Sequence, residues 1–378
     1  MQFDVVTSSI EYNHCENYYF EGVKVKRIAQ KQVRPYHRVK THHFFSRCIQ
    51  AFKYHRDWQR NFWPESLRML HFLKRHGDQF DLLHTFGHAA TTSASLMYAK
   101  MTGKPILIEL VNLMKDPHQY EPAIISRLYG KGFPKQAHIV CLSNKLKELC
   151  IDHGYSEDQL WTRPNPVDET RFYYEPNARV ELPFQFPELK NSDIRILQIA
   201  KFRPLKNQLF MVNVLKLLPD NFKLILAGPL AESGPISTSD KAYFKTLQDA
   251  IKTFHLEKRV FIIPEFIQNP EKLMKSSDIF VMPSTSEALG TPSLEALSCG
   301  VPVVTSDIPG VFDQWIKPGI NGFICPLIEQ EWADKIQQTA KISRVAMQLE
   351  SKAILDWAAT SAIDTRYFEK LQTLIANK

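Results

Sequence analysis

The second half of the chain alternates short apolar runs with helical patterns, and this alternation constrains the fold more than any other feature. The predicted strands are Ile194–Ala200, Phe222–Gly228, Arg259–Phe266, Asp278–Ser284, Val301–Asp307 and Gly322–Leu327. The predicted helices are Asn207–Leu218, Lys241–Leu256, Pro270–Ser277, Pro292–Ser298, Val311–Ile316 and a long one over about Gln330–Ala358. Continuous apolar strands separated by helices are typical of a parallel sheet buried on both faces. Such a sheet binds ligands at the carboxyl ends of its strands.

The first half of the chain has a less regular pattern of the same kind. Its predicted strands are Phe3–Ser8, Val23–Ile28, Phe80–Thr85, Pro105–Glu109 and His138–Ser143, and a helix is predicted over Asn144–His153. A Pro-rich polar stretch follows, which favours a linker. We therefore expect an α/β domain over 1–176, a linker over 177–192, a second α/β domain over 193–358, and a C-terminal helix within 359–378 that packs back on the first domain.

Composition narrows the class of protein. The 378 residues include no apolar run long enough to span a membrane, and the first residues lack the pattern of a signal peptide. The six cysteines are scattered without zinc spacing, which indicates free thiols in a reducing cytoplasm and no structural metal. We expect a cytoplasmic protein. A peripheral position at the inner face of the membrane is the alternative, suggested by the basic stretch described next.

Positive charge gathers in residues 24–75, where 14 Lys and Arg face only Asp57 and Glu65. Aromatic residues are interleaved with these charges. One interpretation is a solvated basic face over a few core aromatics. The other is a surface that meets anions, either the headgroups of an anionic membrane, bound weakly, or an anionic acceptor. No recognised nucleic-acid motif occurs, so we expect no nucleic-acid partner.

The most informative segment follows the predicted strand that ends near Pro283. Thr291 is predicted to be the N-cap of the next helix, with Pro292 at its first position. The amides and the dipole of this helix start would face the carboxyl edge of the sheet, which favours an anion there. Gly290 would let a phosphate approach the backbone closely.

Two carboxylates flank this predicted anion site, Glu287 in the loop and Glu295 one turn into the helix. Carboxylates beside an anion site suit the hydroxyl groups of a sugar and a ribose, because each oxygen accepts hydrogen bonds. The plainer alternative is an ordinary strand–helix connection with surface glutamates.

A second polar segment follows the strand over Ile194–Ala200. Lys201 and Lys206 lie in it, at the carboxyl end of the strand. Two cations there suit an anionic ligand such as a diphosphate. The alternative is a surface loop that happens to be basic.

These segments resemble the retaining glycosyltransferases of family four, which have the GT-B fold and belong to the glycosyl transferases group 1. Glu287 and Glu295 have the Glu-x7-Glu spacing of that family, and residues 299–304, Cys-Gly-Val-Pro-Val-Val, complete its signature. The resemblance implies two Rossmann-like domains whose parallel sheets face a central cleft. It also implies transfer of a hexose from a nucleoside-diphosphate sugar to a hydroxyl of a saccharide or lipid-linked acceptor, with retention of configuration, in glycan, glycolipid or envelope polysaccharide biosynthesis.

The resemblance also implies roles for single residues. Glu295 would hold the ribose of the donor, and Glu287 would contact the transferred sugar. The amides of Leu289, Gly290 and Thr291 would meet the diphosphate. Lys206 matches the lysine of the family and Lys201 replaces its usual arginine, so both are candidate catalytic residues. Arg203 is a further donor-binding candidate, because it could supply the guanidinium that this replacement removes.

In the first domain the resemblance is weaker. Residues 81–84, Asp-Leu-Leu-His, resemble a strand end of the family and make His84 an acceptor-side candidate, with Asn112 and Asp116. Phe3–Ser8 resembles the second strand of the family rather than the first. On that alignment the opening strand, glycine loop and helix are missing, and we expect donor binding to survive while transfer is weakened or lost.

No Asp-x-Asp occurs in the chain, so the sequence requires neither a metal nor any other cofactor. Two rival functions stay open. One is a nucleotide-sugar epimerase of GT-B fold, which product analysis without acceptor would distinguish. The other is a truncated, non-catalytic protein that binds a nucleotide sugar. A nicotinamide dehydrogenase is disfavoured, because no Gly-x-Gly-x-x-Gly follows a predicted strand.

Overall fold

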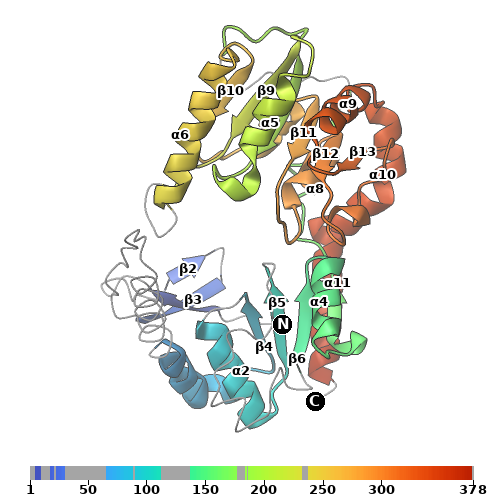
Figure 1. The fold of residues 1–378 in the computed structure, drawn as a ribbon. Helices are drawn as coiled ribbons and strands as arrows, with labels where there is room; N and C mark the ends of the chain where they lie inside the picture. The colour runs from blue at the N-terminus through green and yellow to red at the C-terminus, as the bar shows by residue number, and fades with distance from the viewer. Residues whose placement is uncertain are drawn as a thin grey trace. The chain divides into compact units, whose positions relative to one another are not determined.

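The structure is a computed structural model that describes residues 5–9, 18–20, 23–29, 65–87, 90–111, 137–176, 184, 186–231 and 237–376. The chain divides into two compact units (Figure 1). Unit 1 takes residues 1–141, 147–161 and 369–378, and unit 2 takes residues 142–146 and 162–368. No helix in the described ranges is long and apolar enough to cross a membrane.

Unit 2 contains one sheet of six parallel strands in the order β10-β9-β8-β11-β12-β13. In chain order the strands are β8 (Ile194–Ile199), β9 (Phe222–Ala227), β10 (Val260–Ile263), β11 (Ile279–Met282), β12 (Val303–Ser306) and β13 (Gly322–Cys325). Each lies within the predicted range, which confirms the predicted sheet. The central pair is β8 and β11, with Ile196 beside Ile279.

Two sets of helices contact this sheet. The first set is α5 (Gln208–Leu215), α6 (Ser237–Thr253) and α9 (Glu329–Thr339), and the second is α7 (Pro270–Lys275), α8 (Thr291–Ser298) and α10 (Arg344–Ala358). In the first set α5 packs on β9, α9 packs on β12 and β13, and α6 packs on α5. In the second set α8 packs on β11 and β12, and α7 and α10 pack on α8. Successive residues of β11 are all buried, and Ile279 and Val281 join the core cluster that contains Trp332 of α9. The strands are apolar throughout because both faces of the sheet are covered.

Two helix predictions in this unit were wrong. The long helix over about Gln330–Ala358 is two helices, α9 and α10, with a break at residues 340–343. Ser343 caps the second helix, and its hydroxyl accepts a hydrogen bond from the amide of Ala346 at 3.4 Å. The helix predicted over Val311–Ile316 is a single 3-10 turn, Phe312–Gln314.

Unit 1 contains two sheets in its described part. One has the order β4-β5-β6-β7 and the other has the order β1-β3-β2. The strands of the first are β4 (Leu83–Phe86), β5 (Ile106–Leu110), β6 (Ala137–Cys141) and β7 (Leu160–Thr162), and those of the second are β1 (Val5–Ser9), β2 (Tyr18–Phe20) and β3 (Val23–Ala29). The pairs β4–β5, β5–β6 and β1–β3 are parallel.

Helices accompany the first of these sheets. Residues 65–76 are helical, and α2 (Ala90–Thr102) packs on β4 and β5. Further along the chain lie α4 (Asn144–Asp152) and α11 (Thr360–Ala376). Residues 360–368 of α11 belong to unit 2 and residues 369–376 to unit 1. Both units are therefore α/β with parallel strands.

Candidate active site

The carboxyl ends of β8 and β11 bring two polar loops of unit 2 together. β8 leads into the loop that carries Lys201 and Lys206, and β11 leads into the loop that carries Glu287. The two loops are joined directly, because the amide of Thr285 donates a hydrogen bond to the carbonyl of Leu205 at 3.0 Å. The strands are adjacent and parallel, so both loops emerge at the same edge of the sheet.

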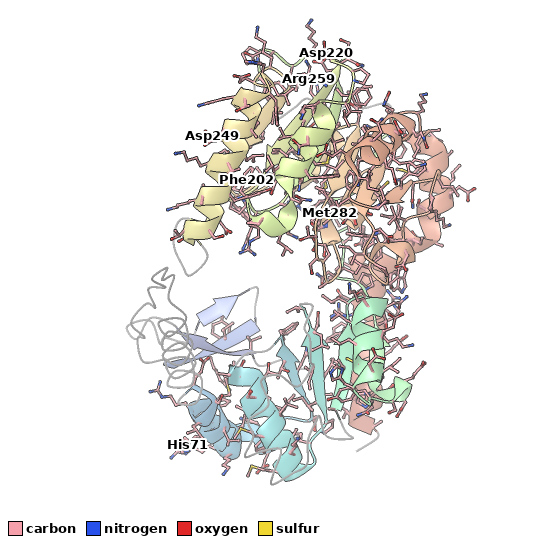
Figure 2. All side chains as sticks on the ribbon, viewed as in Figure 1. His71, Phe202, Asp220, Asp249, Arg259 and Met282 are labelled. Atoms are coloured by element: carbon pink, nitrogen blue, oxygen red, sulfur yellow. The ribbon has the colours of Figure 1, made fainter. Side chains whose placement is uncertain are left out.

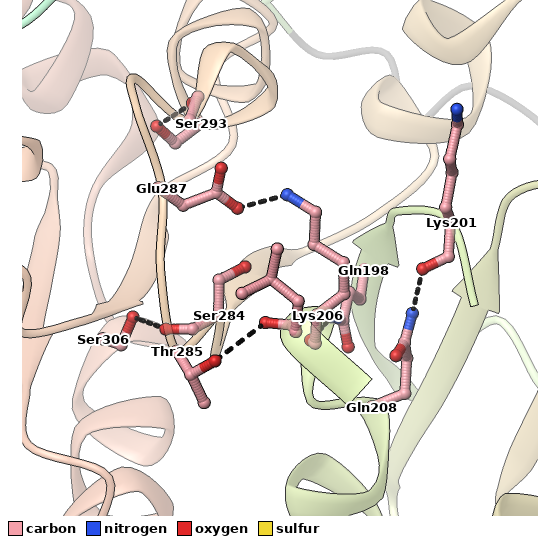
Figure 3. A network of polar contacts seen from close by, with 11 residues as sticks. Gln198, Lys201, Lys206, Gln208, Ser284, Thr285, Glu287, Ser293 and Ser306 are labelled. Carbon is pink, nitrogen blue, oxygen red and sulfur yellow. Dashed lines mark hydrogen bonds and ion pairs between the residues drawn. The ribbon is translucent and has the colours of Figure 1, made fainter. Parts of the chain in front are cut away.

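Lys206 and Glu287 form an ion pair in which the ammonium donates to Oε1 of the carboxylate (Figure 3). The two side chains are 22% and 10% exposed, so the pair is partly withdrawn from water while it stays accessible. The 3-10 turn Pro204–Lys206 presents the lysine and ends at Asn207, which has a φ of 55°. Two of the predicted catalytic residues therefore lie in contact.

Lys201, the third predicted catalytic residue, is exposed, and its side chain points away from this pair (Figure 3). Arg203, a predicted donor-binding residue, faces Asp240 of α6, with Nη2 3.6 Å from Oδ2. Asp240 is only 6% exposed, so Arg203 neutralises a buried carboxylate at the start of that helix. Neither residue is brought to the Lys206–Glu287 pair.

The helix α8 begins one residue earlier than predicted. Gly290, with a φ of 78°, takes the N-cap position, and Thr291 is the first helical residue, so the prediction of Thr291 as N-cap was wrong. The left-handed backbone of Gly290 excludes most other residues. A Cβ there would also lie 2.4 Å from Cε1 of Phe312. The backbone at the start of α8 is therefore held against an aromatic ring.

Hydrogen bonds from neighbouring side chains hold the same turn at the start of α8. The Ser293 hydroxyl donates to the carbonyl of Gly290 at 2.7 Å, and the indole of Trp315 donates to that hydroxyl at 3.1 Å. The Thr291 hydroxyl accepts from the amide group of Asn165 at 3.1 Å. Leu289, the remaining candidate here, is buried at 3% exposure, which leaves only its backbone for a ligand.

Glu295 lies one turn further along α8, partly buried. Burial raises the pKa of its carboxyl to about 7, and Glu271 adds to the rise while Arg171 opposes it. Arg171 donates to Glu271 at 2.8 Å, so its charge is shared with a second carboxylate. The Glu295 carboxylate is therefore poorly solvated, and hydroxyl groups that donate hydrogen bonds to it would stabilise its ionised form.

Sequence reasoning missed two glutamines at this edge. Gln198 in β8 and Gln208 in α5 are 2% and 1% exposed. Their side-chain amides donate to the carbonyls of Lys206 at 2.7 Å and Lys201 at 2.9 Å. The available signal was a glutamine in an otherwise apolar strand, because a buried amide in such a run needs a partner.

In unit 1 the strand β4 carries His84 as its second residue. Its Nε2 lies 3.5 Å from Oε2 of Glu109, at the end of the neighbouring strand β5, and its ring stacks on Phe86 with centroids 4.3 Å apart. Glu109 is 4% exposed and was not predicted as a site residue. The other two acceptor-side candidates, Asn112 and Asp116, lie outside the described residues.

Comparison with known proteins finds a family model that matches most of unit 2. Residues 181–355 match the model of the family Glycosyl transferases group 1. The chain is 24% identical over 261 residues to the UDP-Gal:alpha-D-GlcNAc-diphosphoundecaprenol alpha-1,3-galactosyltransferase of Escherichia coli, a stretch that covers 66% of this chain and 63% of that protein. It is 26% identical over 256 residues to the N-acetyl-alpha-D-glucosaminyl L-malate synthase of Bacillus anthracis, covering 66% and 62%. The chain thus spans less than two thirds of the length of these relatives.

Solved structures share the fold. The crystal structure of Anabaena HepE in complex with UDP and glucose superimposes with a TM-score of 0.65 at 18% identity, covering 93% of this chain and 87% of that one. These matches confirm the GT-B fold class and the resemblance to glycosyl transferases group 1 that the Glu-x7-Glu segment indicated.

Proposed function

We propose that this chain transfers a hexose from a nucleoside-diphosphate sugar to a hydroxyl group with retention of configuration, a function supported by the match of residues 181–355 to the model of the family Glycosyl transferases group 1. The observation that carries the proposal is the ion pair of Lys206 and Glu287 beside the helix start at Gly290. A cation, a helix start and carboxylates at one sheet edge fit the diphosphate and the hydroxyl groups of such a donor.

Each residue has a part in this proposal. Glu295 accepts hydrogen bonds from the ribose, and the backbone of Leu289, Gly290 and Thr291 meets the diphosphate. Lys206 neutralises the charge that grows on the leaving phosphate, and Glu287 orients both this lysine and a hydroxyl of the sugar. Lys201 follows β8 at the same sheet edge and is a second candidate cation for the phosphates, although its side chain points away from the Lys206–Glu287 pair. No metal or other cofactor is needed in this scheme.

The reaction balances without any further reactant. The bond between C1 of the sugar and the phosphate oxygen breaks, and a bond forms between C1 and the acceptor oxygen. The acceptor proton passes to the departing phosphate oxygen on the same face, and a nucleoside diphosphate leaves. Lysine is suited to the leaving group because charge there is greater in the transition state than in the bound donor.

The names of similar proteins suggest which substrates to try first. The Escherichia coli relative is a galactosyltransferase acting on a diphosphoundecaprenol-linked sugar, and the Anabaena structure holds UDP and glucose. We therefore propose a uridine-diphosphate hexose as donor and a saccharide or lipid-linked saccharide as acceptor, in glycan or envelope polysaccharide synthesis.

The test begins with calorimetric titration of UDP, GDP and ADP sugars, followed by product analysis with and without acceptor. Transfer to an added acceptor, with the anomeric proton of the early product in the configuration of the donor, would support the proposal. An altered sugar released without acceptor would instead show an epimerase, and binding without any product would show a binding protein.

Variants locate the activity at this site. Lys206→Ala should reduce turnover far more than donor affinity. Glu329→Gln, an exposed residue at the start of α9, is a control that should change neither. A loss of donor affinity with intact turnover in Lys206→Ala would contradict the catalytic role.

A further inference from the structure

We propose that Gln198 and Gln208 are positioning residues that hold the Lys201–Lys206 loop in the shape that receives the diphosphate of the donor. This inference rests on the proposed function and deepens it. It concerns the two buried amides and not the lysine side chains themselves, which touch the ligand.

Each amide is placed by a regular element. Gln198 is the residue before the end of β8, and Gln208 is the first residue of α5, so both sit on backbone that the sheet and its helix fix. Their side chains are almost fully buried, at 2% and 1% exposure. Side chains with so little room hold one rotamer, and a hydrogen bond from them fixes its partner.

The partners are the carbonyls of the two lysines. Gln198 Nε2 donates to Lys206 O at 2.7 Å, and Gln208 Nε2 donates to Lys201 O at 2.9 Å (Figure 3). The loop is thereby fastened near both of its ends, at the residues whose ammonium groups matter. Only four residues separate the two lysines, so the two bonds leave the loop little freedom.

The backbone of this loop needs such support. Asn207, between Lys206 and Gln208, has a φ of 55°, a left-handed conformation that costs free energy in a residue other than glycine. The loop also carries the Leu205 carbonyl, which accepts the amide of Thr285 from the Glu287 loop. A shift of the lysine loop would therefore also separate Lys206 from Glu287.

The side-chain oxygen of each amide indicates that these glutamines do not serve to stabilise the fold. The buried Oε1 atoms of Gln198 and Gln208 have no hydrogen-bond partner among the described residues. A buried acceptor without a partner destabilises the folded state, and an apolar side chain of the same shape would not. Groups that lower stability and are kept at a ligand edge fit a role in function.

The test uses Gln198→Met and Gln208→Met, which keep length and volume and remove the donor. Gln348→Met is the matched control, because Gln348 also donates to a backbone carbonyl, that of Leu297 at 2.5 Å, elsewhere in unit 2. Calorimetry on the full chain compares the tightest binder among UDP, GDP and ADP with the corresponding nucleoside monophosphate. Melting temperature is measured for every variant.

We expect the two site variants to bind the diphosphate about tenfold more weakly, as expected for the loss of one hydrogen bond at the binding geometry. The monophosphate, held through the ribose, should bind as in the wild type, and the melting temperature should be unchanged or higher. Unchanged diphosphate affinity, or an equal loss for both nucleotides with a lower melting temperature, would overturn the positioning role.

The two proposals fail differently. If the wild type binds a diphosphate and Lys206→Ala weakens it while the glutamine variants do not, only the positioning role is overturned. If the wild type binds none of the three diphosphates, the proposed function fails and the positioning role fails with it.

Discussion

The ammonium of Lys206 donates a hydrogen bond to the carboxylate of Glu287, across 81 positions of the sequence. Under the proposed function, the positive charge that would meet the leaving group is thus already paired with a carboxylate of the protein. A diphosphate that binds here has to share Lys206 with Glu287, and the strength of this ion pair enters both donor affinity and turnover.

Glu287→Gln tests this sharing. The glutamine amide is nearly the same size as the carboxylate but carries no negative charge, so it no longer forms an ion pair with Lys206. We therefore expect tighter binding of the free nucleoside diphosphate and lower kcat for transfer. Titration of the diphosphate and initial-rate kinetics measure the two effects. Weaker diphosphate binding in this variant would contradict competition for Lys206, with Glu329→Gln as the control.

Glu295 predicts a pH dependence of donor binding. Its pKa is raised to about 7 by burial, and the ribose hydroxyls are expected to donate to its ionised form. Affinity should then fall about tenfold for each pH unit below 7 and level off above it, because the carboxyl must first lose its proton. Calorimetry between pH 5.5 and pH 8.5 gives the profile, in steps of about half a unit. A similar slope in Glu295→Gln would exclude this residue as its source.

The same shift predicts a change in folding stability. Folding raises the pKa of Glu295 from 4.5 to about 7, so its stabilising contribution is present below pH 4.5 and is lost as the pH rises to about 7. The loss is on the order of 3 kcal/mol at most. Urea unfolding at both ends of this range should show it in the wild type and not in Glu295→Gln.

Gly290→Ala should destabilise unit 2. The left-handed backbone alone costs about 1 kcal/mol for alanine, and the new Cβ would lie 2.4 Å from the Phe312 ring. Gly319→Ala separates the two effects, because Gly319 has a φ of 80° and nothing within 4 Å of its Cβ position. Denaturant unfolding should therefore show a larger loss in the free energy of unfolding for Gly290→Ala than for Gly319→Ala. Equal losses would mean that the Phe312 ring moves aside at no cost in free energy.

His84→Asn should raise the KM for the acceptor and leave donor affinity unchanged. His84 of β4 lies 3.5 Å from Glu109 of the neighbouring strand β5, a His–carboxylate arrangement that suits a hydroxyl ligand. His71→Asn, at an exposed position of the helix over 65–76 (Figure 2), is the control. If only donor affinity changed, the acceptor-side role would be refuted.

The basic stretch 24–75 should bind anionic vesicles weakly and in a salt-sensitive way. Exposed Lys74 and Arg75 each contribute about 1 kcal/mol near an anionic surface. Flotation of Lys74→Glu/Arg75→Glu with phosphatidylserine vesicles should show less binding than the wild type or Lys352→Glu, an exposed change in unit 2. If the wild type floated equally with anionic and neutral vesicles, only the interpretation of a solvated basic face would be left.

The sheet of unit 2 could be predicted from the sequence because burial on both faces leaves a continuous apolar signal, as in β11. The break between α9 and α10 could not. Residues 340–343, Ala-Lys-Ile-Ser, contain neither Gly nor Pro, the residues that mark a helix end most strongly. The sequence therefore predicts one continuous helix, and the structure shows that Ser343 instead caps a second one.

The candidate site shows the same division. Glu287, Glu295 and Lys206 could be predicted to share one edge of the sheet, because charged residues that follow adjacent parallel strands lie close together. Gln208 could not, because its partner is a backbone carbonyl, which a sequence does not display. The partner that the structure gives Arg203, the buried Asp240 of α6, could not be predicted either, because it lies in a distant part of the sequence.

The adjacency of β8 and β11 also bears on how unit 2 folds. The two strands are neighbours in the sheet although β9 and β10 lie between them in the chain, so their pairing is a long-range contact. Until that pairing forms, Lys206 and Glu287 are on separate pieces of chain. A nucleotide that touches both loops would therefore bind only molecules in which β8 and β11 are paired, and binding would stabilise that pairing. Nucleotide binding during refolding would then report the formation of the β8–β11 pair.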